Sequence, residues 1–555
     1  MACQSFQKKF VNGLCKLCGF LLKYNLSSHI PNTQYQQPTS ESSLKSNIID
    51  SILIEFFEFE KYYENQQESI LSFLSGHDIL TILKTGGGKS LIYAAASVLY
   101  RGLTVVFTPQ KALIDDQVRE IVGMGISAAI LYASSEQPPL VQEKIFAEIA
   151  SGLIRVLFIT PEKYTENLKF CTMLQNVYNI RGLQFVIDEV HCVVLYKGFW
   201  NAWKNLGILK HDFPTVPVLA LTATCSFIDT KIIQSALERP DMKIIRNSTI
   251  HRSEIILEVR PKPATKDKLY QAIFNLLDNL EGRAIIYGAT VKECDNMTKA
   301  LCKNFDPTIV GIYHGKLTSA KQTAISAGWK NGTIKIMYAT TAFGMGINVD
   351  NIILVIHTTL SMSHKQYIQE IGRAGRAGQE SKAILFYSRG DICTLLSILN
   401  GGQVSNSVES QNLSHQFTTI NTIEEKKAKI KAMMLYADAI YECRQQLAYY
   451  SFLWPNNTQI PEYHICDDCK EREKDAPDMY VVDVFYGSKN NNEAKKNLAY
   501  ISEYPRYIQT RLHPKKMCFY LLDSLIQKEI IIQVVDLQRI RPESSILTCS
   551  YKILE

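Results

Sequence analysis

The chain lacks a marked excess of charge of either sign. Its 60 lysine and arginine residues stand against 54 aspartate and glutamate residues, so the formal net charge is only +6 over 555 residues. A uniformly basic or acidic surface, which would attract a partner of opposite charge from all sides, is therefore excluded. Any surface that holds a polyanion must be built from local patches of lysine and arginine.

Long hydrophobic runs are also missing. No apolar stretch approaches the roughly 18 residues that a membrane-spanning helix needs, and the polar, basic residues 1–10 are not followed by the apolar core of a signal peptide. Fourteen cysteines lie mostly inside apolar segments, which is typical of thiols in a reducing compartment. We therefore expect a protein with no membrane partner, in the nucleus of a eukaryotic cell and otherwise in the cytoplasm.

The length of the chain predicts several domains, because 555 residues exceed what one hydrophobic core usually serves. Residues 1–50 become rich in serine, asparagine and glutamine after Leu26, and this composition predicts a flexible arm. Within the arm, Cys15, Cys18 and His29 have the spacing of the first three ligands of a small zinc finger, but no second histidine follows. An incomplete finger and a plain helix both stay open.

A glycine loop between an apolar run and a helical stretch is the strongest local signal. Residues 79–83 are mostly apolar and residues 84–90 have the sequence Lys-Thr-Gly-Gly-Gly-Lys-Ser. Glycines let successive N–H groups converge on one anion, to which the following helix adds its partial positive charge. We predict a phosphate loop, with Mg²⁺ on the last hydroxyl, made by Thr85, Gly86, Gly87, Gly88, Lys89 and Ser90. Leu83 replaces the glycine of the strict pattern, and a plain glycine turn is the alternative.

Strand-like apolar runs alternate with amphipathic stretches over residues 51–250, which predicts a parallel sheet with helices on both faces. The expected strands are residues 79–83, 104–108, 156–160, 185–187 and 218–221. Ligands gather at the carboxyl ends of such strands. Asp188 follows one strand end and can hold Mg²⁺, and the adjacent Glu189 can orient and activate a water molecule, although a solvated loop is the alternative.

A second alternating series covers residues 251–398 and repeats this architecture without a glycine loop of its own. Its expected strands are residues 284–287, 310–313, 334–338, 352–356 and 383–387. Arg373 and Arg376 lie at the end of a helical stretch and can present guanidinium groups to the γ-phosphate, with a salt-bridged surface turn as the alternative. Two such domains that share one nucleotide would close the cleft between them when ATP binds and open it after hydrolysis.

Five segments together resemble the motifs of superfamily-two helicases of the RecQ type. They are residues 86–90 (GGGKS), 188–192 (DEVHC), 221–224 (LTAT), 339–348 (ATTAFGMGIN) and 369–376 (QEIGRAGR). The resemblance covers roughly residues 52–397. It implies two tandem RecA-like domains, ATP and Mg²⁺ as cofactors, and unwinding of duplex DNA by 3′-to-5′ movement along a single-stranded 3′ tail, in DNA repair or recombination.

The resemblance also implies roles for single residues. Gln66 resembles the family's adenine-recognising glutamine, and His191 the histidine that couples hydrolysis to DNA. Segments that grip the strand contain Thr108, Pro109, Gln110 and Thr160. An aromatic loop, in which stacking on a base is worth about 1–3 kcal/mol, contains Tyr196, Phe199, Trp200 and Trp203. Leu195 replaces a polar residue in this loop, and the loop is one residue shorter than in the family, which predicts weaker coupling between DNA and ATP. The alternative role of the aromatic residues is packing beneath the motif.

The C-terminal third is expected to contain a linker (399–422), a zinc-binding helical subdomain (423–475) and a winged-helix-like module (476–555). The family has a four-cysteine zinc site, and Cys443, Cys466 and Cys469 match three of its ligands. Tyr463 occupies the fourth position, so the adjacent His464 is the expected replacement, and three free thiols are the alternative. In the last module we expect a strand at 481–485, a helix at 514–528 and a hairpin of residues 530–535 and 545–553, with scattered basic residues for phosphates.

Two hypotheses follow. The first is an ATP-dependent DNA helicase, and the second is a degenerate relative that binds DNA or a protein partner and hydrolyses ATP poorly. The altered aromatic loop and the replaced cysteine motivate the second hypothesis. RNA stays open as a substrate because contacts to the backbone hardly distinguish the two sugars. The sequence does not indicate an oligomeric state.

Overall fold

The structure is a computed structural model of the 555-residue chain. It describes residues 10–11, 14–24, 48–109, 111–132, 137–195, 201–247, 252–278, 280–343, 349–401, 413–439, 443–450, 452, 454, 466–467, 531–541 and 544–553. The chain divides into two compact units. The first contains Met1–Arg252, Ala342–Asp350 and Ser451–Thr458, and the second contains Ser253–Thr341, Asn351–Tyr450 and Gln459–Glu555.

The first unit is built on a seven-stranded sheet in the order β5-β6-β4-β7-β8-β3-β9, and every pair in it is parallel. The strands are β3 (Ile79–Ile82), β4 (Leu103–Phe107), β5 (Ala128–Leu131), β6 (Val156–Ile159), β7 (Leu183–Ile187), β8 (Val218–Thr222) and β9 (Lys243–Arg246). This confirms the parallel sheet expected from the sequence. Strands β5 and β9 were not expected; both are partly exposed edge strands, and β9 begins and ends with a charged residue.

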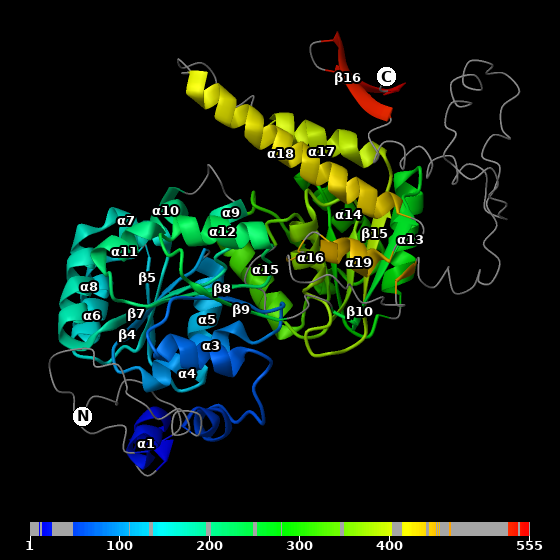
Figure 1. The fold of residues 1–555 in the computed structure, drawn as a ribbon. Helices are drawn as coiled ribbons and strands as arrows, with labels where there is room; N and C mark the ends of the chain where they lie inside the picture. The colour runs from blue at the N-terminus through cyan, green and yellow to red at the C-terminus, as the bar shows by residue number, and fades with distance from the viewer. Residues whose placement is uncertain are drawn as a thin grey trace, which may run out of the picture. The chain divides into compact units, whose positions relative to one another are not determined.

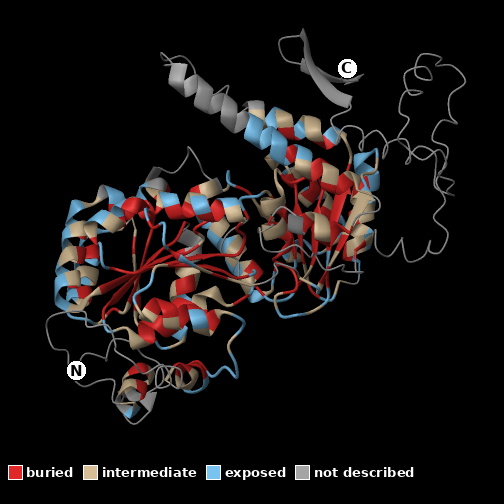
Figure 2. Ribbon diagram, viewed as in Figure 1, coloured by how far each residue is buried: buried red, intermediate tan, exposed pale blue. Residues whose placement is uncertain are grey.

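Helices cover both faces of this sheet (Figures 1 and 2). Along β4, Val105 and Phe107 belong to one buried cluster and Val106 to the other, because alternate side chains of a strand point to opposite faces. The α-helices of the unit after residue 60 are α3 (Gln66–Leu74), α4 (Lys89–Leu99), α5 (Lys111–Gly123), α6 (Pro139–Ala150), α7 (Pro161–Glu166), α8 (Leu168–Arg181), α9 (Cys192–Leu195), α10 (Asn201–Lys204), α11 (Ile208–Asp212) and α12 (Phe227–Ala236).

A short helix lies inside the segment expected to be a flexible arm. Helix α1 (Lys16–Lys23) follows two paired strands, β1 (Phe10–Val11) and β2 (Leu14–Cys15), and packs on the π-helix η1 (Ile52–Phe56). The Phe20 ring lies 5.7 Å from the Phe56 ring, and Lys23 pairs with Glu55 at 2.6 Å. The polar composition that predicted an arm begins only after this helix. His29 lies outside the described residues, so the incomplete zinc finger stays a prediction.

The second unit contains a six-stranded sheet in the order β10-β15-β14-β11-β13-β12, again with parallel pairs only. Its strands are β10 (Ile255–Pro261), β11 (Arg283–Tyr287), β12 (Val310–Tyr313), β13 (Ile336–Ala339), β14 (Ile352–His357) and β15 (Ser381–Tyr387). Its α-helices are α13 (Lys266–Leu277), α14 (Val291–Asn304), α15 (Ser319–Asn331), α16 (His364–Ile371), α17 (Gly390–Gly401), α18 (Leu413–Asp438) and α19 (Arg444–Tyr450). The predicted pair of parallel-sheet domains is thus confirmed, and α18 begins inside the expected linker.

Strand β10 is an edge strand whose free hydrogen-bonding groups are covered by residues from the C-terminal third. The Gln445 amide donates to the Ile255 carbonyl at 3.1 Å, and the Val259 N–H donates to the Asp467 carboxylate at 2.7 Å. Side chains therefore replace the neighbouring strand that the edge lacks. This contact fixes α19 to the sheet.

The last described element is an antiparallel hairpin of β16 (Ile531–Arg541) and β17 (Ser544–Ile553). A hairpin here agrees with the sequence, although β16 extends further than expected. The expected strand at 481–485 and helix at 514–528 lie outside the described residues, so the winged-helix-like module stays a prediction. Among the described residues, no helix is both long and apolar enough to cross a membrane.

Candidate active site

The phosphate loop connects β3 to α4 as the sequence predicts. Gly86 and Gly88 have φ angles of +79° and +66°, in the left-handed region that glycine adopts at no steric cost. At Gly87 an added Cβ would lie 2.8 Å from the Lys84 carbonyl oxygen, so a side chain is sterically excluded. Lys89 and Ser90 begin α4, where unpaired N–H groups and the helix dipole favour an anion.

Gln66 is tied to this loop. Its amide nitrogen donates to the carbonyls of Gly87 at 3.1 Å and Gly88 at 2.9 Å, and its amide oxygen accepts from the Tyr63 N–H at 2.8 Å. The side chain is buried, and a Cβ at Gly88 would collide with it at 2.4 Å. The residue expected to recognise adenine therefore also fixes the shape of the phosphate loop, since both of its N–H groups have a partner there.

Asp188 and Glu189 follow directly on β7. Burial and the neighbouring Glu189 charge raise the pKa of Asp188 to about 6, while the Lys89 charge lowers it. Lys89, at the start of α4, and Asp188, at the end of β7, therefore belong to one site. Glu189 has a φ of +51°, a strained conformation that is uncommon for a residue with a side chain and that clusters at functional sites.

Gln117 is a member of this site that the sequence reasoning missed. Its amide nitrogen donates to the Asp188 carboxylate at 2.5 Å, and both side chains are buried. The other carboxylate oxygen accepts from the Glu189 N–H at 2.9 Å. Gln117 belongs to α5, which follows the segment expected to grip a strand. A single glutamine in an amphipathic helix carries no local signal, so only the fold reveals it.

His191 joins the acidic pair to the end of β8. Its Nδ1 lies 3.2 Å from the Glu189 carboxylate and 3.1 Å from the Thr222 hydroxyl. The Thr222 hydroxyl in turn accepts from the Thr224 N–H at 3.3 Å. His191 therefore connects Glu189, the residue expected to activate water, to the Thr222 hydroxyl at the end of β8.

The second unit holds the two arginines in a turn that follows α16. The Gly375 N–H donates to the Ile352 carbonyl at 3.1 Å, which anchors the turn to β14. Arg373 is buried, and its Nε has no hydrogen-bond partner among the described residues. Arg376 is half-buried. The alternative of a salt-bridged surface turn does not describe Arg373, because an exposed ion pair needs an exposed guanidinium.

Two family models match this chain, the DEAD/DEAH box helicase over residues 63–231 and the helicase conserved C-terminal domain over residues 265–378. The chain is 33% identical over 390 residues to ATP-dependent DNA helicase Q-like 4B of Arabidopsis thaliana, which is 69% of this chain and 33% of that protein. It is 30% identical over 447 residues to RecQ-like DNA helicase blm-1 of Caenorhabditis elegans, which is 77% of this chain and 42% of that protein. The chain belongs to the RecQ-type helicases of superfamily two.

This RecQ-type chain spans less than half the length of both relatives. Solved structures share its fold. Mycobacterium smegmatis helicase Lhr bound to ssDNA and AMP-PNP aligns with 69% of this chain and 57% of its own at 16% identity and a TM-score of 0.51. The DUF1998 helicase MrfA bound to DNA aligns with 93% of this chain and 68% of its own at 15% identity and a TM-score of 0.51. At such identities the likeness concerns the fold alone, here two RecA-like sheets.

The residues that RecQ-type helicases are expected to place on a strand are only partly described. Thr108 and Pro109 follow β4, and Thr160 follows β6, so all three lie at carboxyl ends of neighbouring strands. Trp203 is buried in the core with Leu206, which agrees with packing beneath the motif and not with stacking on a base. The other expected contacts, Gln110, Tyr196, Phe199 and Trp200, lie outside the described residues.

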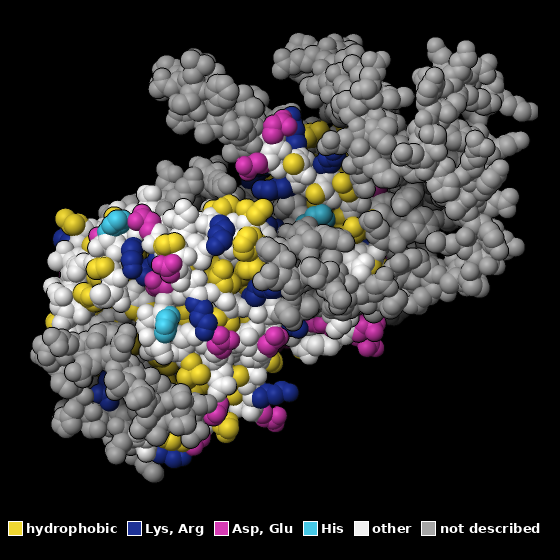
Figure 3. Space-filling view, viewed as in Figure 1, with side chains coloured by type: hydrophobic (Ala, Val, Ile, Leu, Met, Phe, Trp, Pro, Cys, Tyr) yellow, Lys and Arg dark blue, Asp and Glu magenta, His cyan; other side chains and the backbone are white. Residues whose placement is uncertain are grey.

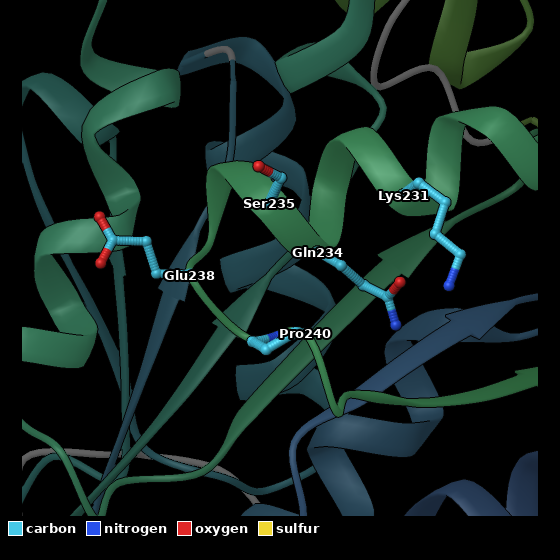
Figure 4. Close-up of a pocket in the computed structure, with 5 residues that line it drawn as sticks. All are labelled: Lys231, Gln234, Ser235, Glu238 and Pro240. Atoms are coloured by element: carbon cyan, nitrogen blue, oxygen red, sulfur yellow. The ribbon is translucent and has the colours of Figure 1, made fainter.

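No broad basic face is visible on the side of the RecQ-type chain drawn in Figure 3, where the described lysine and arginine side chains are scattered among acidic and apolar ones. This agrees with the low net charge. A pocket of about 450 Å³ lies beside α12 and is lined by Lys231, Gln234, Ser235, Glu238 and Pro240 (Figure 4). Its lining includes none of the nucleotide-site residues, so we assign it no role in ATP chemistry.

The expected zinc site is half described. Cys443 and Cys466 are both buried, whereas His464 and Cys469 lie outside the described residues. Each described cysteine directly precedes one partner of an ion pair, in which Arg444 Nε lies 2.5 Å from the Asp467 carboxylate. The pair holds the two cysteine-bearing segments together. Within the described part of the chain, no group of three or more His, Cys, Asp or Glu side chains could hold a metal ion.

Proposed function

We propose that this chain is an ATP-dependent DNA helicase that moves 3′-to-5′ along a single-stranded DNA tail and separates the duplex ahead of it. The observation that carries the proposal is the set of Asp188 and His191, both buried, with the half-buried Lys89 and Glu189 beside one glycine loop, in a chain whose relatives are named DNA helicases. The proposed activity has two parts, ATP hydrolysis and movement along the DNA strand.

In the hydrolysis step Lys89 neutralises the outer phosphates of ATP, and Glu189 orients a water molecule and accepts its proton. Arg373 and Arg376 stabilise the charge that develops on the transferred phosphoryl group. His191 lies against both Glu189 and Thr222, so a change at the nucleotide reaches the end of β8 through two contacts.

Mg²⁺ would be held by the Ser90 hydroxyl and the Asp188 carboxylate. Both donors are oxygen atoms, which suit this hard cation. Burial raises the pKa of Asp188 to about 6, and a cation bound beside the carboxylate would lower this pKa and keep the group ionised. When bound, the ion neutralises charge on the phosphates.

The DNA strand would run over the carboxyl ends of β4 and β6, where Thr108, Pro109 and Thr160 follow the strands, and over Gln110. The aromatic loop would add stacking from Tyr196, Phe199 and Trp200. Helix α5 links this surface to the ATP site, because Gln117 reaches Asp188 from it. A role in DNA repair or recombination in the nucleus would follow from such an activity.

We also propose zinc on Cys443, His464, Cys466 and Cys469. Three thiolates and one imidazole suit this metal, and the Arg444–Asp467 pair joins the residues that directly follow Cys443 and Cys466. Zinc content measured on the purified protein, with Cys466→Ser as the matched variant, tests this. Equal and negligible zinc in both samples would contradict the site.

The second candidate function is a degenerate relative that clamps DNA or a protein partner and hydrolyses ATP weakly. The burial of Trp203 and the presence of Leu195 favour it, because both reduce the means by which a strand signals to the ATP site. The two candidates differ in how much single-stranded DNA stimulates ATP hydrolysis.

The deciding experiment measures strand separation on duplexes with a 3′ tail, a 5′ tail and no tail, together with ATP hydrolysis with and without single-stranded DNA or RNA. The helicase proposal expects unwinding of the 3′-tailed duplex only, and its loss in Lys89→Ala. DNA binding without unwinding, with hydrolysis that DNA does not stimulate, would favour the degenerate relative. Unwinding of the 5′-tailed duplex would contradict the polarity.

A further inference from the structure

Arg252, the last residue of the first unit, reaches back to the phosphate loop. Its Nη1 donates to the Thr85 carbonyl at 3.1 Å, across 167 residues of sequence, and the arginine is half-buried. The contact is made to the backbone of the loop, so it does not depend on the Thr85 side chain. Because the second unit begins at Ser253, the chain first leaves the first unit from a residue that is tied to this loop.

Other carbonyls of the phosphate loop are held as well. The Lys84 carbonyl accepts from the Gly87 N–H at 2.8 Å. The Gln66 amide nitrogen donates to the Gly87 carbonyl at 3.1 Å and to the Gly88 carbonyl at 2.9 Å. Together with the carbonyl that Arg252 holds, these contacts fix peptide groups along the whole loop, and two of the donors are side chains from distant segments.

The orientation of these carbonyls decides where the N–H groups of the loop point. In a trans peptide the C=O and the N–H of the following residue point in opposite directions. The carbonyl held by Arg252 therefore directs the Gly86 N–H away from the arginine, and the two carbonyls held by Gln66 direct the N–H groups of Gly88 and Lys89 away from the glutamine. Within the described part of the chain, none of these three N–H groups has a hydrogen-bond partner, so all three are left for an anion.

We propose that Arg252 is a positioning residue for the phosphate loop, which holds the Thr85 carbonyl so that the Gly86 N–H stays directed at the phosphates of the nucleotide. The inference rests on the proposed function, in which this loop binds ATP. Glycines have the largest backbone freedom of all residues, so a glycine loop depends on its neighbours for a single shape. A loop that is fixed before the ligand arrives loses less conformational freedom on binding, and the benefit therefore belongs to nucleotide affinity.

Arg252→Met removes the donor and keeps an unbranched aliphatic side chain. We expect the dissociation constant of a fluorescent ADP analogue, measured with Mg²⁺, to rise about tenfold, because the lost hydrogen bond has a charged donor. In the ligand-free protein, amide hydrogen exchange of residues 84–90 should become faster. Arg155→Met is the matched control and should change neither quantity. Arg155 is also half-buried and donates to a backbone carbonyl, that of Tyr100 at 2.7 Å, but it precedes β6, at the opposite end of the parallel strands from the loop.

Arg252→Lys keeps a donor on a long side chain, so it should bind the ADP analogue more tightly than Arg252→Met, and equal affinities in these two variants would refute the hydrogen bond as the cause. Lys89→Ala separates this inference from the proposed function, because it should weaken ADP binding if the loop holds the phosphates. If Lys89→Ala weakens binding but Arg252→Met binds ADP like Arg155→Met, the positioning role is refuted and the proposed nucleotide site stands. If Lys89→Ala binds ADP as the wild type does, the loop is not the nucleotide site, and both proposals fail.

Discussion

The two units have the same kind of sheet but different chemistry at their strand ends. In the first unit the proposed anion site consists of backbone N–H groups of a glycine loop between β3 and α4. Among the described residues of the second unit no such loop joins a strand to a helix, and the expected anion contact is a side chain, Arg373. A backbone site is fixed by the local chain conformation, whereas a guanidinium site needs neighbours to hold it. In the second unit the Gly375 N–H anchors the turn of Arg373 to the Ile352 carbonyl at 3.1 Å, and the His357 ring contacts Glu370 near the end of α16 at 2.8 Å.

The largest effect tests the first unit. Glu189→Gln keeps the size of the side chain but removes the carboxylate that would accept a proton from water, so kcat for ATP hydrolysis should fall about a thousandfold. Phosphate release measured with saturating single-stranded DNA checks this, and binding of a fluorescent ADP analogue should stay unchanged. Activity within about twofold of the wild type would remove Glu189 from the mechanism.

The next effect tests the second unit. Arg373→Lys keeps the positive charge but loses the planar fork of donors, so we expect kcat to fall about a hundredfold with KM for ATP nearly constant. The same assay measures it. Arg389→Lys is the control, because Arg389 pairs with Asp438 at 3.3 Å in the same unit and away from the turn. Equal activities in the two variants would mean that charge alone is sufficient at position 373.

A tenfold effect is expected from Gln117→Ala. The Asp188 carboxylate loses the amide that holds one of its oxygens, and the loss of such a supporting contact lowers metal affinity by about tenfold. Binding of Mn²⁺ measured by electron paramagnetic resonance, and the Mg²⁺ concentration for half-maximal hydrolysis, should both shift by this factor.

Gln184→Ala is the control for that experiment. Gln184 is a buried glutamine of β7 whose amide donates to the Thr104 hydroxyl at 2.7 Å, so its loss should affect stability and not the metal. Metal affinity that is the same in both variants would contradict a role of Gln117 at Asp188.

The smallest effect concerns the stability of the second unit. Burial lowers the pKa of His364 to about 4, below the usual 6.5, so between these pH values the folded protein binds fewer protons than the unfolded chain. The free energy of unfolding should therefore fall as the pH falls, by on the order of 1 kcal/mol between pH 7 and pH 6. Urea unfolding of the second unit at both pH values measures this, and His364→Phe, which keeps a ring beside Tyr436, should reduce the difference. If His364→Phe leaves the difference in the free energy of unfolding between pH 7 and pH 6 unchanged, His364 is not its cause.

The comparison between the two units also separates what local sequence can predict from what it cannot. The central strands were predicted because a strand buried on both faces is mostly apolar, as in β6. The edge strands β9 and β10 were not predicted, because charged residues interrupt or bound their apolar residues, and β5 was missed although it is apolar. Helix α1 lies in the segment with Cys15 and Cys18, where the sequence left a plain helix open but assigned residues 1–50 to a flexible arm on the polar composition that begins after Leu26.

The sequence by itself determined the phosphate loop, the acidic pair after β7 and the arginine turn, because each is a short segment whose residue types are required by the local backbone or by the chemistry. Only the tertiary structure decided the partners that hold them. Gln117 reaches Asp188 across 71 residues of sequence, and His191 contacts Thr222 at the end of the neighbouring strand β8. Such contacts depend on which strands become neighbours in a sheet, and no spacing within a single segment records that choice.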